Sequence, residues 1–265
     1  MKVTVLGSGT STGVPEYLCV CETCRDARRP GSKNNRTRPS IHIEEDGVRL
    51  QVDTGPNFLD QIDRNGVDWI DAVIYTHCHA DHISGTNDLV MPCRKQEMDM
   101  PIYGPGETMD VLLKNFDYMF SKQTFKGGGV AHLIPQAVSD RFDACGVEFL
   151  PVPVTHGAVA TYGYRVGPLG YVPDVKLMPD ASLELLQGVD VLIIDALSFN
   201  PRHPTHLSVG EAAEISERLR PERTYLTHIM HRLDHRTFPE QCAEQGVDLP
   251  DSVVEHPFLG PGPVA

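Results

Sequence analysis

Four side chains that commonly bind metals are crowded into one short stretch of this sequence. The stretch Thr76-His-Cys-His-Ala-Asp-His82 contains His77, His79, Asp81 and His82. The residues at 71–76 are mainly apolar, β-branched or aromatic, which is typical of a buried strand. We therefore predict that the ligands lie on the loop where a strand ends, so that their side chains converge. A surface turn that holds histidines by chance is a poor alternative, because structural roles rarely need this density of ligands.

The length and composition of the chain suit one large α/β domain. It has 265 residues, of which 40% are hydrophobic and 22% are charged, which is enough apolar material for a sizeable core. The formal net charge of -13 would repel a nucleic-acid backbone, so we expect no nucleic-acid partner. A small anionic substrate would need a local positive centre, and bound divalent metal ions supply one.

The sequence predicts a cytoplasmic protein without a membrane partner. Its N-terminal residues 1–7 start a strand directly and lack the apolar segment of a secretory signal. No apolar run approaches the length of a membrane span. The sequence leaves the oligomeric state open, with a homodimer as the candidate assembly.

Several predicted strands end at residues that can bind metals. These are a hairpin over 40–53 ending on Asp53, a strand over 147–154 leading to His156, strands over 162–166 and 170–172 leading to Asp174, and a strand over 224–227 reaching His228. Other expected elements are strands over 2–6 and 189–194 and helices over 107–120, 183–186 and 209–219, the last opened by Ser208. Glycines at 127–129 break the first helical pattern, and the tail from Pro257 is expected to be irregular.

Seven side chains are candidate ligands for two metal ions. The candidates are His77, His79 and His156 for one ion, Asp81, His82 and His228 for a second, and Asp174 between them. Sequence spacing alone supports only the cluster at 77–82. A single His or Asp at the end of a strand is more often a capping or turn residue, so the other three depend on their recurring position and on the resemblance described below.

A second metal site is predicted from the cysteines. Three of the seven cysteines, Cys19, Cys21 and Cys24, lie within six residues, which favours a metal site over a disulfide framework. A structural zinc ion takes four ligands, and we select His231, three residues after His228, as the fourth. The zinc-binding cysteines would lie in an insert at about 15–38, and the bound ion would tie this insert to the C-terminal part of the chain. The alternative is a set of free or buried thiols.

The order of these residues resembles that of the metallo-β-lactamase superfamily. The family's motifs are an Asp after an early strand, His-x-His-x-Asp-His, a later His, an Asp and a final His. The matching positions are Asp53, His77 to His82, His156, Asp174 and His228. The resemblance covers nearly the whole chain and implies an α/β fold, a four-layer αββα sandwich with two mixed β-sheets. It also implies two divalent ions, zinc or manganese, with Asp53 as a support behind the ligands and not a ligand itself.

The cysteine pattern narrows the resemblance. Cys-x-Cys-x-x-Cys after a glycine-rich loop, with His-x-x-His late in the chain, resembles the phosphoribosyl cyclic phosphate phosphodiesterases of the carbon-phosphorus lyase pathway. The resemblance to those enzymes implies a structural zinc ion held by three cysteines and a histidine. It also implies that His206 is a general acid. His203 is a nearby competitor for that role, and the structural alternative is an exposed His206 before a helix. Phe199 and Pro173 depart from the family's pattern and leave the substrate open.

We therefore predict a metal-dependent hydrolase of a small, cyclic phosphodiester, in which Asp81 and His206 take part in catalysis. One alternative is hydrolysis of a carboxylic ester, lactone or thioester at the same site. An alternative of another class is a non-catalytic carrier protein of cofactor biosynthesis, against which the intact metal loop argues. A diiron oxidoreductase would favour Glu at the position of His79. We interpret Arg36 and Arg38 as a solvated basic segment and exclude them from the site.

Overall fold

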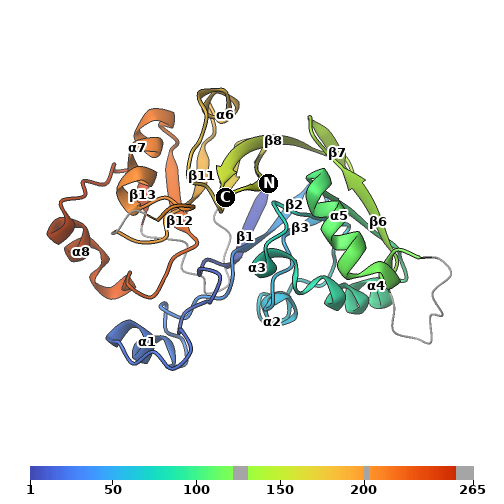
Figure 1. Cartoon of the computed structure of the whole chain (residues 1–265), viewed down its shortest axis with the longest axis horizontal. Coiled ribbons are helices and arrows are strands. Elements are labelled where there is room, and N and C mark those ends of the chain that lie inside the picture. The colour runs from blue at the N-terminus through green and yellow to red at the C-terminus, as the bar shows by residue number, and fades with distance from the viewer. Residues whose placement is uncertain (122–130, 200–202, 255–265) are drawn as a thin grey trace.

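The computed structural model describes residues 1–121, 131–199 and 203–254, and contains two β-sheets (Figure 1). The first sheet has the strand order β1 (Lys2–Gly7), β2 (Ser40–Glu45), β3 (Val48–Val52), β4 (Ala72–Ile74), β5 (Met100–Gly104) and β6 (Leu133–Ala137). The second has the order β13 (Val253–Val254), β12 (Arg223–Thr227), β11 (Val191–Asp195), β10 (Leu169–Val172), β9 (Val159–Val166), β8 (Val147–His156) and β7 (Phe142–Ala144). Both sheets mix parallel and antiparallel neighbours.

Helices cover the outer faces of the sheets. Those that pack on the first sheet are α2 (Phe58–Arg64), α3 (Ala80–Ile83), α4 (Val90–Gln96) and α5 (Gly106–Asn115). Those that pack on the second are α6 (Asp180–Leu185), α7 (Val209–Leu219) and α8 (Phe238–Gln245). The remaining helix, α1 (Glu22–Ala27), lies in the cysteine-containing insert, and short 3-10 helices span Thr86–Leu89, Asp117–Met119 and His235–Thr237. The predicted four-layer αββα sandwich is therefore confirmed.

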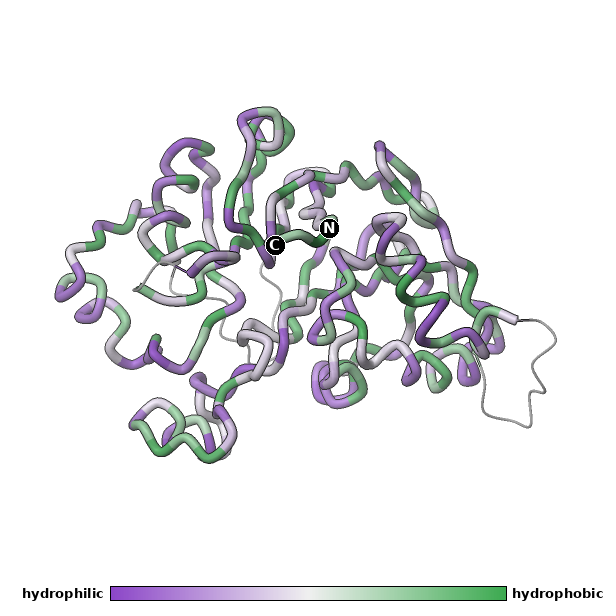
Figure 2. Tube along the Cα trace, in the orientation of Figure 1, coloured by the Kyte–Doolittle hydropathy of each residue, from purple (hydrophilic) through white to green (hydrophobic). Residues whose placement is uncertain are grey.

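Alternation along the strands explains the layers. In β4, Ala72 and Ile74 join the core between the two sheets, whereas Val73 and the following Tyr75 join the core beneath the helices. Successive side chains of a strand point to opposite faces, so a strand buried on both faces must be apolar throughout. Figure 2 colours the chain trace by residue hydropathy, with hydrophobic residues in green. The strand that precedes the histidine-rich loop is thus anchored on both sides.

Most predicted elements are present, with corrected ends. The hairpin forms as β2 and β3, and α7 occupies the predicted residues with Ser208 and Glu211 in a capping box. The predicted strand over 147–154 continues to His156. The helix predicted over 107–120 is too long, because α5 ends at Asn115 and a 3-10 turn follows. The break at 127–129 and the tail from Pro257 lie outside the described residues. Across the described residues, none of the helices has both the length and the apolar character needed to traverse a membrane.

A buried histidine lies in the first sheet, far along the sequence from the candidate ligands. His42 sits in β2 between Ile41 and Ile43, which face the second sheet, so its side chain points to the opposite face. Burial lowers the pKa of His42 to about 4. In an unfolded chain a histidine titrates near about 6.5.

We predict that acidification destabilises the fold through His42. Because the pKa is lower in the folded state, the unfolded state binds more protons between the unfolded value, about 6.5, and the folded value, about 4. The contribution of neutral His42 to stability is therefore complete above this window and is lost as the pH falls through it, by about 3 kcal/mol. Urea unfolding of wild type and His42→Leu across this pH range checks the prediction. The gap between their free energies of unfolding should change by this amount, and a constant gap would contradict it.

Candidate metal centre

The histidine-rich loop connects β4 to α3. His77 and His79 precede α3, and Asp81 and His82 lie within it. His77 Nε2 lies 3.0 Å from His79 Nδ1, and His156 Nε2, at the end of β8, lies 3.1 Å from the same atom. Three nitrogens that bind one tetrahedral ion at about 2.0–2.1 Å lie roughly 3.3 Å apart. The first three predicted ligands therefore fit a single metal ion.

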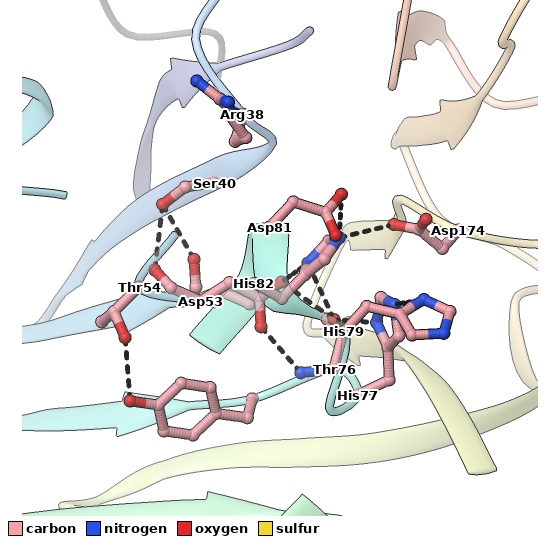
Figure 3. A network of polar contacts seen from close by, with 12 residues as sticks. Arg38, Ser40, Asp53, Thr54, Thr76, His77, His79, Asp81, His82 and Asp174 are labelled. Atoms are coloured by element: carbon pink, nitrogen blue, oxygen red, sulfur yellow. Dashed lines mark hydrogen bonds and ion pairs between the residues drawn. The ribbon is translucent and has the colours of Figure 1, made fainter. Parts of the chain in front are cut away.

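Asp81, His82 and His228 form a second group of possible ligands. Figure 3 shows the carboxylates of Asp81 and Asp174 directed towards His82. Asp81 Oδ2 is 3.4 Å from Nε2 of both His82 and His228. One oxygen of Asp174 is 3.0 Å from His82 Nε2, and the other is 3.2 Å from His228 Nε2 and 3.6 Å from His156 Nε2. A single carboxylate thus faces imidazoles from both groups, as a ligand that bridges two ions must.

Two of these atoms are buried without a hydrogen bond among the described residues. His82 Nε2 and Asp174 Oδ2 lie 3.0 Å apart but lack hydrogen-bond geometry with each other. Burial of an unsatisfied polar atom is costly, whereas a cation between the two would satisfy both. The combination of imidazole nitrogen and carboxylate oxygen suits zinc and manganese.

Burial and neighbouring charges set the ionisation of the ligands. Burial lowers the pKa of His77 well below its usual value and that of His156 to about 4, so both offer a neutral nitrogen lone pair. Burial alone would raise the pKa of Asp174, but His228 and His82 outweigh it and hold that pKa well below its usual value. Burial acts to lower the pKa of His82, and Asp174 and Asp53 reverse this effect and raise it. Asp174 therefore carries negative charge at the centre of the site.

Asp53 supports the ligands from behind, in the position that the resemblance implies. Its Oδ2 lies 2.7 Å from His82 Nδ1, so that the Nε2 atom of the same ring is directed towards Asp174. The backbone N–H and the hydroxyl of Thr76 both donate to the same carboxylate. Fixing one ring nitrogen in this way orients the other towards a metal.

Close backbone contacts hold the loop in place. A Cβ on Gly55 would lie 2.1 Å from the carbonyl oxygen of Asp81, and one on Gly85 would lie 2.2 Å from the carbonyl oxygen of Gly55. The Thr54 N–H also donates to the carbonyl oxygen of His82. The glycines after β3 and α3 therefore allow the two loops to pack backbone to backbone beneath the ligands.

His206 lies beside the metal ligands, and His203 does not. The buried ring of His206 is 4.3 Å from that of His228 and 4.6 Å from that of His156, measured between centroids. The structural alternative, an exposed residue before α7, is therefore wrong for His206. His203, the competitor for the acid role, is exposed and contacts Thr205.

Sequence reasoning missed one residue of this group. Asp195, the last residue of β11, is fully buried, and its Oδ2 accepts a hydrogen bond from His206 Nδ1 at 2.8 Å. The same oxygen accepts from the backbone N–H of Val175, next to Asp174. Burial raises the pKa of Asp195, although His206 acts against this. The signal was present, because Asp195 directly follows the strand predicted over 189–194, as several candidate ligands follow theirs.

The cysteine cluster and His231 come together in the insert. The Sγ atoms of Cys19, Cys21 and Cys24 lie 3.2, 3.5 and 3.5 Å from His231 Nδ1. A sulfur and a nitrogen bound to one tetrahedral zinc ion at about 2.3 and 2.0–2.1 Å lie roughly 3.6 Å apart. These residues therefore fit the predicted fourfold set of ligands.

A buried polar network joins the insert to the segment after His231. Asn34 donates to Asp234 Oδ1 at 2.9 Å and to Asp26 Oδ2 at 3.0 Å. Arg36 is buried and donates to the carbonyl oxygen of Leu233 at 2.9 Å, and burial lowers its pKa to about 10. The interpretation of Arg36 as a solvated residue is therefore wrong.

The neighbouring Arg38 also has fixed partners. Its Nε donates to the carbonyl oxygen of Ser11 at 3.0 Å, and its Nη1 donates to Asn57 Oδ1 at 3.1 Å. The side chain is half-buried, so the picture of a freely solvated basic segment does not hold here either.

Comparison with known proteins agrees with the family resemblance inferred from the sequence. A sequence model described as a beta-lactamase superfamily domain matches residues 48–229, which include the histidine-rich loop, His156, Asp174 and His228. The chain belongs to the metallo-β-lactamase superfamily. The match and the geometry of the site together support a metal-dependent hydrolase of that superfamily.

Three relatives place the chain within the superfamily. The crystal structure of a diphosphatase from the PhnP family has a TM-score of 0.83 and 37% sequence identity, covering 96% of this chain and 94% of that one. An octanoyltransferase of Porphyromonas gingivalis is 31% identical over 87% of this chain, which spans 46% of its length. Coenzyme PQQ synthesis protein B of Methylobacterium radiotolerans is 27% identical over 79% of this chain and 77% of its own. The predicted superfamily and fold are thereby confirmed.

Proposed function

We propose that this metallohydrolase is a phosphodiesterase that acts on a small, cyclic phosphodiester. The observation that carries the proposal is Asp174, whose two oxygens face imidazoles of both ligand groups. The 37% identity to a diphosphatase of the PhnP family supports chemistry at phosphorus. The overall negative charge of the chain makes a local cationic centre the natural place to bind an anionic substrate.

Each ligand group would hold one ion. The first is His77, His79 and His156, the second is Asp81, His82 and His228, and Asp174 is shared. Two divalent ions, when bound, lower the pKa of a bound water molecule to near neutrality. They also neutralise the charge that develops on a phosphodiester. Asp81 would act in catalysis by holding this second group, since its Oδ2 faces both His82 and His228.

His206 is positioned to donate a proton to the leaving group. The hydrogen bond from its Nδ1 to Asp195 leaves Nε2 as the atom that can exchange a proton with the substrate. The carbonyl oxygen of Thr205 lies 2.8 Å from His156 Nδ1, so the segment that carries His206 also contacts a ligand. Histidine suits acid catalysis near neutral pH.

We also propose that the cysteine cluster with His231 holds a structural zinc ion. Its four ligands leave no position open for substrate, which is typical of structural and not catalytic sites. The insert at about 15–38 would then be fixed to the C-terminal segment both by the ion and by the network around Asn34.

The decisive experiment combines metal content with turnover. Purified protein should contain close to three divalent ions per chain and hydrolyse bis-p-nitrophenyl phosphate after exchange into Mn²⁺. Cyclic ribose phosphates are the next substrates to test. One ion per chain without turnover would contradict the proposal and favour a binding function.

We predict that His206→Ala slows hydrolysis of alkyl phosphodiesters far more than that of p-nitrophenyl esters. An alkoxide leaving group needs a proton, and p-nitrophenolate hardly does, so we expect a loss of about 100-fold or more on the alkyl substrate alone. Asp195→Asn keeps the shape of the side chain and should show the same selectivity more weakly. Steady-state kcat/KM on paired substrates measures this. Equal losses on both would remove His206 from the acid role.

A second candidate function is hydrolysis of an acyl ester or thioester. Its support is the similarity to an octanoyltransferase, and the matched region makes up 46% of that protein's length. Turnover of an octanoyl thioester that exceeds turnover of every phosphodiester tested would select this function. If no ester is cleaved, the similarity to Coenzyme PQQ synthesis protein B would favour a carrier role.

A further inference from the structure

The segment that follows Asp174 holds the loop of His206 through a lysine. Lys176 Nζ donates to the carbonyl oxygen of His206 at 3.3 Å. It also donates to both carboxylate oxygens of Glu211, in the first turn of α7, at 2.9 and 3.2 Å. One side chain from the ligand segment therefore contacts both the backbone of the proposed general acid and the helix that follows it.

The backbone around Lys176 is itself fixed beside the metal centre. The N–H of Lys176 donates to the carbonyl oxygen of Thr155, the next-to-last residue of β8, at 2.7 Å. The N–H of Val175 donates to Asp195, the carboxylate that accepts from His206 Nδ1. The side chain of Lys176 thus extends from an anchored backbone, and its contact with the carbonyl oxygen of His206 transmits that anchoring to the loop.

The ion pair between Lys176 and Glu211 lies largely out of solvent. Each of the two side chains is 18% exposed. Burial alone would raise the pKa of Glu211, but hydrogen bonds from Ser208 and Lys176 outweigh burial and lower that pKa, so the carboxylate stays charged. Glu211 also accepts from the backbone N–H and the hydroxyl of Ser208 in the capping box. Because charged hydrogen bonds are stronger where water is excluded, this pair fixes the lysine at the start of α7.

The peptide group that joins His206 to Leu207 is held on both sides. Its N–H donates to Asp195 Oδ2 at 3.4 Å, and its carbonyl oxygen accepts from Lys176 at 3.3 Å. The same oxygen of Asp195 receives the hydrogen bond from the ring of His206. A general acid must stay within hydrogen-bond reach of the leaving group, and a displacement of about 1 Å can cost on the order of 100-fold in rate. Loss of the lysine would remove one of the two contacts that set this peptide group.

We propose that Lys176 is a positioning residue for the proton donor and keeps His206 aligned with the metal centre. This inference rests on the acid role of His206 proposed above. Lys176 does not contact the substrate in this arrangement, because its ammonium group is directed at three acceptors of the protein and its side chain is mostly buried. It therefore acts through His206, and its removal should spare every step that needs no acid.

Kinetics on paired substrates measure the effect of Lys176→Met, which keeps the length of the side chain and removes its charge and its donors. With the cyclic ribose phosphate that wild type hydrolyses fastest, we expect kcat to fall by about 10-fold and KM to stay unchanged, because an alkoxide leaving group needs the proton. With bis-p-nitrophenyl phosphate, kcat should stay within about two-fold of wild type, because p-nitrophenolate leaves without one.

Two further variants control the comparison. Lys2→Met makes the same chemical change in a Lys–Glu pair on β1, outside both ligand clusters, and should alter neither substrate's turnover. Glu211→Gln keeps a residue that suits a capping box but removes the charge that holds the lysine. It should show the selectivity of Lys176→Met more weakly, and it carries the test if Lys176→Met does not fold.

A double-mutant cycle separates positioning from a purely structural role. If Lys176 acts through His206, Lys176→Met should change kcat on the cyclic substrate by less than about two-fold in the His206→Ala background. Equal losses on both substrates, or an undiminished loss in that background, would overturn the positioning role and leave the proposed phosphodiesterase intact. Absence of leaving-group selectivity in His206→Ala, or a wild type that cleaves no alkyl phosphodiester, would overturn the acid role and this inference with it.

Discussion

Asp174→Asn should remove most of the activity and lower the metal content. We expect kcat/KM for bis-p-nitrophenyl phosphate to fall by at least about 1,000-fold, because the charged oxygens face His82, His228 and His156 at 3.0, 3.2 and 3.6 Å. The amide has the shape of the carboxylate but no negative charge, and its nitrogen would point donors at the ions. Loss of the negative charge at Asp174 should therefore weaken the binding of both ions together.

Metal analysis after dialysis, alongside kinetics, measures this effect. Asp180→Asn is the matched control, since Asp180 is an exposed aspartate that pairs with Arg218 on the surface, and it should change neither quantity. Circular dichroism of both variants should match wild type, because the substitution preserves volume. A variant that keeps its ions and its activity would show that Asp174 does not bridge the two ligand groups.

Local sequence patterns were sufficient for several elements and for the first ligands. The ligand-bearing loop at 77–82 follows a strand whose apolar run needs no distant information, and Ser208 with Glu211 marks the start of α7 within four residues. Spacing within one loop can also reveal a metal site, because the ligands are neighbours in the chain. These features were accessible for that reason.

Contacts between distant segments were not accessible from local patterns. Arg36 reads as a solvated basic residue until the segment after His231 covers it and supplies the carbonyl oxygen of Leu233. Asp195 gains its role only when the loop after β11 returns His206 to it. The pairing of Cys19 with His231, 212 residues apart, was inferred from the position of His231 three residues after a candidate ligand, and not from spacing within the cysteine cluster. Burial and long-range geometry are properties of the fold as a whole.

The edge strand β6 and the helices α4 and α8 escaped prediction for another reason. In β6 four of the five residues are exposed, so the strand lacks the alternation that marks a half-buried strand. The helix α4 contains a proline, and α8 has one at its start, which weakens a helical pattern in the sequence. Such elements are stabilised by their neighbours more than by their own residues.

Cys24→Ser should show that the proposed structural zinc also supports the active site. Cys24 is fully buried and its Sγ lies 3.5 Å from His231 Nδ1, so its loss would open the fourfold set of ligands. We expect one ion fewer per chain and a melting temperature lower by about 10 °C, corresponding to at least about 3 kcal/mol. Differential scanning calorimetry with metal analysis measures both. Cys145→Ser is the control, because Cys145 is exposed and outside the cluster.

The same variant should weaken metal binding at the distant histidines. His231 is joined to His228 by Ile229 and Met230, and Ile229 exchanges backbone hydrogen bonds with Ser8 and Thr10. His228 itself has a φ of 57°, a conformation that its surroundings must enforce. Release of His231 would relax this segment, so Cys24→Ser should lose active-site ions to a chelator at least about 10-fold faster than Cys145→Ser. Equal rates would show that the insert stabilises the fold without acting on the metal centre.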